Sequence, residues 1–154
     1  MKNRVVKIVV YALAGFLVIA QLFRIDKTNP AVDASVDYLA TVEVPAEVSQ
    51  LLKASCYDCH SDETAYPWYT NIAPVSWWIK KHINDGRKHL NFSVWGTYTA
   101  KRKAHKMEEC YEMVEEGEMP MASYTWMHGD AALDDDQKAL LVDWFKKQEA
   151  AFKE

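Results

Sequence analysis

Cys56-Tyr57-Asp58-Cys59-His60 is the stretch around which the rest of this chain can be interpreted. The C-x-x-C-H pattern is the attachment signature of a c-type haem. Two thiols three residues apart lie on one side of a helical turn, so both can form thioethers to the same porphyrin. His60 follows one turn after Cys56 and can offer an imidazole nitrogen to the iron. The alternatives are a redox dithiol, half of a zinc site and a chance match.

The composition predicts one domain with a real core and a short additional segment. The chain has 154 residues, of which 49% are hydrophobic and 12% aromatic, including six Trp and eight Tyr. A large flat cofactor is one use for so many rings, and an aromatic-rich core is the other.

The first two dozen residues differ from everything after them. Three basic residues precede an uncharged run that contains one amide, Gln21; they are Lys2, Arg4 and Lys7, and the run is Ile8 to Phe23. With the residues from Val5 onward, the apolar stretch is long enough to cross a bilayer as a helix. Basic residues before such a helix keep the N-terminus in the cytoplasm. The small-x-small pattern Ala12-Leu13-Ala14 suggests a cleaved signal peptide instead, but only half of the run precedes it.

We therefore predict that residues 1–24 form an uncleaved, single-pass signal anchor in the inner (cytoplasmic) membrane, with the remainder in the periplasm. This segment holds four basic residues and no acidic one, so residues 25–154 hold 14 basic and 22 acidic residues, a net charge of −8. Such a charge argues against nucleic acid as a partner of the exported part. It is compatible with a basic redox protein, and the membrane location points to respiratory components.

Export changes how the cysteines are interpreted. In an oxidising compartment a free C-x-x-C closes into a disulfide, and there is no strand pattern for a thioredoxin-like dithiol. A structural zinc site needs four ligands, and the chain has no second Cys/His pair at metal spacing. One covalent haem c is the cofactor that agrees with both the motif and the location.

Residues 25–44 lack clear periodicity and are predicted to be a linker, which leaves 45–154 as the haem-binding domain. Apolar residues three and four apart predict several helices in that domain. They are expected from Pro45 to Cys56, from Trp77 to Asp85 between a Ser76 cap and Gly86, from Thr99 to Glu116 before Gly117, and from about Leu133 onward. The expected fold is all-α, a small cytochrome c-like domain behind a transmembrane helix. Cys110 lies on an apolar stripe and is expected to be a buried hydrophobe.

The second face of the iron needs its own ligand. Met119, in Gly117-Glu118-Met119-Pro120-Met121, is favoured because a thioether is a soft donor and the flanking Gly and Pro shape a loop. Met121 and His82 are the alternatives, together with an open site. Pro74 is weakly preferred as the residue whose carbonyl orients His60, and Trp78 is expected to shield the haem.

Several motifs in order resemble one known family. They are the run through Ser61, Tyr66-Pro67-Trp68-Tyr69, Asn71 to Trp78, Gly86-Arg87, Leu90 to Trp95, Gly117 to Pro120, and Asp143-Trp144. Together they resemble the haem-binding domain family of exported bacterial proteins, over about residues 46–149. The resemblance implies a monohaem c-type domain behind an anchor and places weight on Met119, but it does not define a reaction.

The predicted function is single-electron transfer on the periplasmic side, by an electron carrier rather than an enzyme. His/Met ligation leaves no open iron position, which suits a carrier. The alternatives are a haem enzyme or a gas or peroxide sensor with an open sixth position, and a thiol protein that carries no haem.

Overall fold

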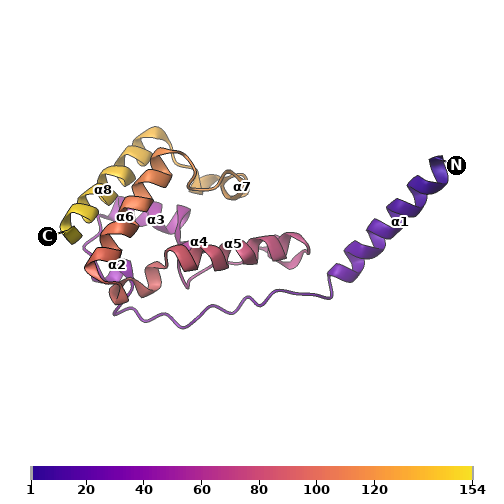
Figure 1. Cartoon of the computed structure of the whole chain (residues 1–154), viewed down its shortest axis with the longest axis horizontal. Coiled ribbons are helices and arrows are strands. Elements are labelled where there is room, and N and C mark those ends of the chain that lie inside the picture. Colours follow the sequence, from indigo (N-terminus) through magenta and orange to yellow (C-terminus); the bar gives the residue numbers. More distant parts are fainter. Residues whose placement is uncertain (1, 154) are drawn as a thin grey trace.

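The computed structural model describes residues 2–153, and every regular element in that part of the chain is a helix. The elements are α1 (Lys2–Ala20), α2 (Tyr38–Thr41), α3 (Ala46–Ser55), α4 (Tyr57–His60), η1 (Trp68–Asn71), α5 (Val75–His89), η2 (Phe92–Thr97), α6 (Ala100–Glu115), α7 (Ala122–Thr125), η3 (Gly129–Ala131) and α8 (Asp135–Lys153). In Figure 1, α1 extends away at one end while the other helices pack together. The all-α prediction is confirmed.

The core of the packed body lies where α6 and α8 run antiparallel, with α3 alongside (Figure 1). Apolar side chains three and four apart on each helix fill this space, as an amphipathic stripe requires. Leu52 of α3, Met107 of α6 and Leu141 of α8 are fully buried, at 0% exposure. This core fixes the helix that leads into the C-x-x-C-H motif.

Helix α6 has the ends that the sequence predicts. The Thr99 hydroxyl accepts a hydrogen bond from the Arg102 amide at 3.3 Å and so caps the first turn. Gly117 follows the last turn with φ of 73°, a left-handed conformation that favours glycine. Between them, Cys110 packs against the core, and burial raises the pKa of its thiol. Its predicted place on the apolar stripe is confirmed.

The end of the expected linker is part of the packed body. Tyr38 of α2 is fully buried, and its hydroxyl accepts a hydrogen bond from Trp144 Nε1 at 2.9 Å. Val36 O accepts a hydrogen bond from Gly96 N at 2.7 Å, which ties the same segment to η2. Four helical residues are too few to produce a periodic pattern, so this packing could not be predicted from periodicity.

Helix α5 differs from its prediction at both ends. It begins one residue before Ser76, which is buried inside the first turn, and it continues past Gly86 to His89. Gly86 therefore does not end the helix. A Cβ at this position would lie 2.7 Å from the carbonyl oxygen of Cys59, so the glycine lets α5 pack directly against the C-x-x-C-H turn.

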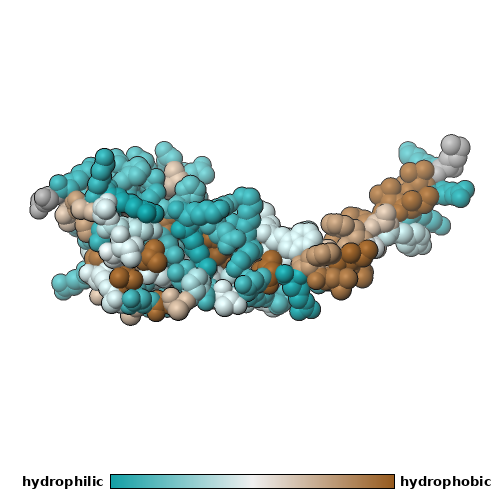
Figure 2. Space-filling model, turned by 60° about the horizontal axis from the view of Figure 1, so that its bottom comes forward, coloured by the Kyte–Doolittle hydropathy of each residue, from teal (hydrophilic) through white to brown (hydrophobic). Residues whose placement is uncertain are grey.

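Helix α1 is long and apolar enough to cross a membrane, by length and composition; a signal sequence has the same properties. Most of its large apolar side chains are exposed. Figure 2 shows the contrast between the apolar surface of this helix and the largely hydrophilic surface of the rest.

Candidate functional site: the C-x-x-C-H turn and its crevice

The C-x-x-C-H segment forms one helical turn directly after α3. Cys56 ends α3 by donating its amide to Leu52 O at 2.9 Å. The carbonyl of Cys56 then accepts from the amides of Cys59, at 3.2 Å, and His60, at 2.9 Å. All three side chains that the motif contributes are therefore held on a single turn, as the spacing predicts.

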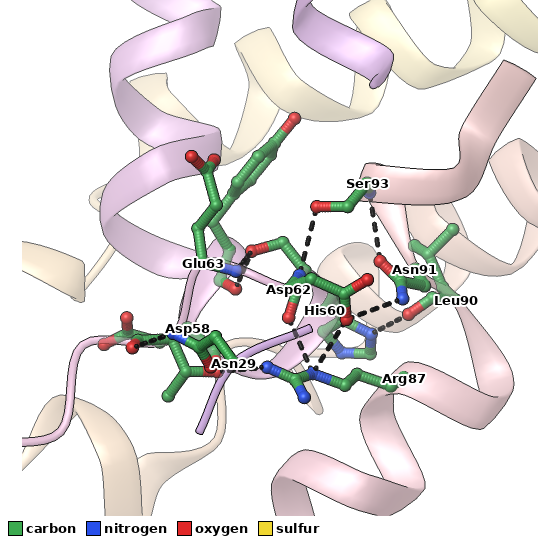
Figure 3. Close-up of polar contacts among 12 residues, drawn as sticks. Asn29, Asp58, His60, Asp62, Glu63, Arg87, Leu90, Asn91 and Ser93 are labelled. Carbon is green, nitrogen blue, oxygen red and sulfur yellow. Dashed lines mark hydrogen bonds and ion pairs between the residues drawn. The ribbon is translucent and has the colours of Figure 1, made fainter. Parts of the chain in front are cut away.

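His60 is oriented by a carbonyl on α5's C-terminal side. Its Nδ1 lies 3.1 Å from Leu90 O (Figure 3). Because a carbonyl only accepts, Nδ1 carries the proton and Nε2 has a free lone pair. Burial lowers the pKa of His60, which favours the neutral imidazole that binds metals.

The weak preference for Pro74 as this carbonyl was wrong. Pro74 O accepts instead from the amides of Trp77, at 3.1 Å, and Trp78, at 3.3 Å, in the first turn of α5. The carbonyl that accepts from His60 belongs to the residue that follows α5. The predicted end of α5, at Asp85, was four residues too early.

A polar network locks the chain after His60 onto α5 (Figure 3). Arg87 Nε donates to Ser61 O at 2.7 Å, and its Nη2 donates to Thr64 Oγ1 and to Asn29 Oδ1, both at 3.0 Å. Arg87 Nε also lies 3.4 Å from Asp62 Oδ1, in a pair whose side chains are 14% and 9% exposed. A buried pair of this kind is strongly destabilised when one member is removed, so it fixes the turn against α5.

Asn91, which caps η2, and Ser93 within η2 complete this network. Asn91 Nδ2 donates to Asp62 Oδ1 at 3.1 Å, and Ser93 Oγ accepts from the Asp62 amide at 3.0 Å. Sequence reasoning assigned no structural task to these side chains. Their presence among the motifs of the family resemblance was the one available signal.

A mainly apolar crevice opens between the motif, α5 and the segment before η3. Among its lining residues are Cys59, Ile79, Ile83, Trp78, His82 and Met121. The structure thus brings one predicted attachment thiol together with Trp78 and the two alternative ligands. Cys56, His60, Pro74 and Met119 are not part of this lining.

Met119 and Met121 lie on a loop between α6 and α7, as expected. The Met119 amide donates to Met113 O at 3.1 Å, which folds the loop back on the end of α6. Both methionine side chains are partly buried. Of the two thioethers, that of Met121 is the one on the crevice.

Two hydrogen bonds that the sequence did not reveal cross the crevice. Tyr124 donates to Asp58 Oδ2, inside the motif, at 2.8 Å. His128 Nδ1 lies 3.2 Å from Tyr124 O, so it carries the proton and Nε2 accepts from the Tyr69 hydroxyl at 3.1 Å. The first bond connects the 121–128 segment to the motif and the second connects it to η1, and nothing in their spacing along the chain predicts them.

The comparison with known families gives one match. The model of a family described as a haem-binding domain matches residues 15–147, which is most of the chain. No curated protein and no solved structure matches the chain.

Proposed function

The chain belongs to the haem-binding domain family, and from this premise we propose that it is a membrane-anchored monohaem c-type cytochrome. In this proposal Cys56 and Cys59 hold one covalent haem c, and His60 binds its iron. When bound, such a haem supplies one-electron oxidation and reduction between its ferric and ferrous states. The observation that carries the proposal is the His60–Leu90 hydrogen bond on a C-x-x-C-H turn, because it presents a neutral, oriented imidazole beside two thiols.

The donor set fits this cofactor. Burial raises the pKa of Cys56 to about 12 and that of Cys59 to about 11, so both are protonated thiols at neutral pH. A thioether forms by adding S–H across a vinyl group, which needs the proton as well as the sulfur and requires no oxidant. The Leu90 carbonyl would orient His60 and increase its donor strength, as outer hydrogen bonds do for metal-bound histidines.

We assign the sixth ligand to a methionine of the 119–121 loop. The loop sequence favours Met119, whereas the place of Met121 on the crevice supports Met121. Either thioether would raise the reduction potential and close the iron to small molecules. Trp78 would help to exclude water, since it lines the same crevice.

Helix α1 would keep the domain at the membrane. The basic residues Lys2, Arg4 and Lys7 at its start favour a cytoplasmic N-terminus and a periplasmic domain. An electron carrier held there meets membrane respiratory partners by motion in two dimensions.

A thiol count tests covalent attachment. The chain has three cysteines, so a haem joined to two of them leaves one thiol, that of Cys110. Purified protein, unfolded in guanidinium chloride without reductant, should react with one equivalent of Ellman's reagent. Its intact mass should include one haem. An intact mass without the haem would refute attachment, with a count of three thiols if Cys56 and Cys59 are free and of one thiol if they form a disulfide.

Optical spectra test the sixth ligand. Oxidised protein with a bound thioether shows a weak far-red band, and the reduced protein binds carbon monoxide slowly. Met119→Ala and Met121→Ala form a matched pair: one should lose the band and bind carbon monoxide quickly, while the other keeps both properties. If the unmutated protein binds carbon monoxide rapidly and lacks the band, the site is open, and a haem enzyme or gas sensor becomes the better description.

A further inference from the structure

The exported end of α1 is joined to the start of α5 by side-chain hydrogen bonds. The Gln21 amide makes a paired contact with the backbone of Ala73: Nε2 donates to Ala73 O at 2.9 Å, and Oε1 accepts from Ala73 N at 3.1 Å. Two residues later, Phe23 O accepts from Trp77 Nε1 at 2.7 Å. The segment before α5 therefore lies beside the end of α1.

Around this junction the domain exposes large apolar side chains. We call Trp68, Ile72, Val75 and Trp77 the junction patch; their exposed fractions are 70%, 44%, 45% and 36%. Leu22 and Phe23, at the end of α1, are also exposed. In Figure 2 brown surface covers much of α1, and the adjoining end of the domain shows white and teal surface with some brown. A group of exposed apolar side chains commonly marks an interaction surface.

We propose that the junction patch lies in the interfacial layer of the bilayer that α1 spans. The proposal rests on the anchoring of α1 proposed above. The apolar stretch from Val5 to Phe23 holds 19 residues and is about 28 Å long as a helix, close to the thickness of the hydrocarbon core, so Phe23 reaches the outer boundary. Side chains bonded to Gln21 and Phe23 then lie at the level of the lipid headgroups. Tryptophan is enriched at this level because its ring is apolar and its N–H is polar.

Neighbouring charge agrees with a phospholipid surface. Arg24 follows the junction directly, and Lys27 donates to Asn71 Oδ1 at 2.6 Å beside the patch. Basic residues next to a membrane helix bind phosphate and anionic headgroups. Asp26 lies between these two basic residues, so the junction carries two basic residues and one acidic residue.

Membrane contact at the junction patch would determine the distance between the crevice and the bilayer surface. Helix α5 runs from Val75 in the patch to Gly86, which packs on Cys59, so at ~1.5 Å per residue the motif lies about 17 Å along the helix from the patch. The crevice would be held near the bilayer surface in one orientation. An electron carrier on a free tether would have no such restriction.

Radiolytic hydroxyl-radical footprinting of the full, haem-loaded chain in phospholipid nanodiscs tests this inference. Radiolysis avoids added peroxide, with which a haem can react. Trp126, which is 85% exposed, is the internal control for Trp68, which is 70% exposed. If lipid covers the patch, Trp68 should be oxidised about fivefold more slowly than Trp126, and Trp77 should be protected as well. Similar rates for Trp68 and Trp126 would overturn the inference.

The Gln21→Leu variant and a comparison of nanodiscs that hold one or two chains distinguish lipid contact from other causes of protection. Gln21→Leu removes the contact with Ala73 without adding charge, so the protection of Trp68 should fall while the haem spectrum stays unchanged. Protection that appears only with two chains per disc assigns the patch to a second copy and overturns the inference. A shortened chain recovered outside the discs refutes the anchor as well, whereas an inserted chain with rapid Trp68 oxidation refutes the patch alone.

Discussion

Gly86 allows α5 and the C-x-x-C-H turn to be in direct contact. A Cβ at this position would meet the oxygen of Cys59 at 2.7 Å, and this oxygen belongs to the backbone, which cannot rotate away as a side chain can. Alanine would gain about 1 kcal/mol of helix propensity, but overpacking against backbone costs about 1–3 kcal/mol. The clash should therefore outweigh the gain.

We predict that Gly86→Ala destabilises the domain and shifts the chain after Cys59, with the loss measured by chemical unfolding of the haem-loaded protein. Gly129→Ala is the matched control, because no atom lies within 4 Å of its added Cβ. That variant should be neutral or slightly more stable, since alanine restricts the unfolded chain. A Gly86→Ala protein as stable as the control would mean that α5 and the motif are not packed as described.

Between elements, Arg87 joins α5, the segment after His60 and Asn29 of the linker. Asp62 depends on it, because this carboxylate is mostly buried and, among residues 2–153, its side-chain partners are Arg87 and Asn91. Removing the guanidinium would leave the charge of Asp62 without its ion pair in a mostly buried site.

We predict that Arg87→Met lowers the free energy of unfolding by about 3 kcal/mol, the size seen when one member of a buried pair is lost. Lys88→Gln is the neighbouring control, because its side chain is 76% exposed and its pair with Asp85 contributes little. Urea titrations followed by circular dichroism would compare the two. Equal midpoints would show that the network does not stabilise the join between α5 and the motif.

The elements that the sequence predicted are those governed by local signals. Helix α6 has a Thr99 cap, a Gly117 end and an apolar stripe between them, so its bounds followed from neighbouring residues. The predicted end of α5 was wrong because glycine commonly ends a helix. Gly86 instead allows close contact with Cys59, which lies 27 positions earlier in the chain. The same non-local packing determines that the carbonyl oxygen of Leu90, rather than that of Pro74, accepts the hydrogen bond from His60.

At the scale of the whole molecule, the net charge of residues 25–154 is negative, whereas the residues around α1 include several basic ones. Residues 25–154 hold 14 basic and 22 acidic residues, so a diffusing partner meets a net charge of −8. In the proposed orientation, the basic residues Arg24 and Lys27 lie next to the bilayer, together with Asp26. We therefore expect the net negative charge of residues 25–154 to attract a cationic partner.

This distribution predicts how electron transfer depends on salt. Opposite charges steer an encounter at low ionic strength, and added salt screens them beyond about 10 Å at 0.1 M. Oxidation of the reduced haem protein by cationic tris(phenanthroline)cobalt(III) should become slower as sodium chloride is raised. Oxidation by anionic hexacyanoferrate(III) should become faster under the same conditions. Stopped-flow absorbance of the haem band measures both rates, and opposite salt slopes would support an acidic docking surface. A rate with the cobalt complex that rises with salt would instead indicate that the haem edge is surrounded by basic residues, and the partner would then be acidic.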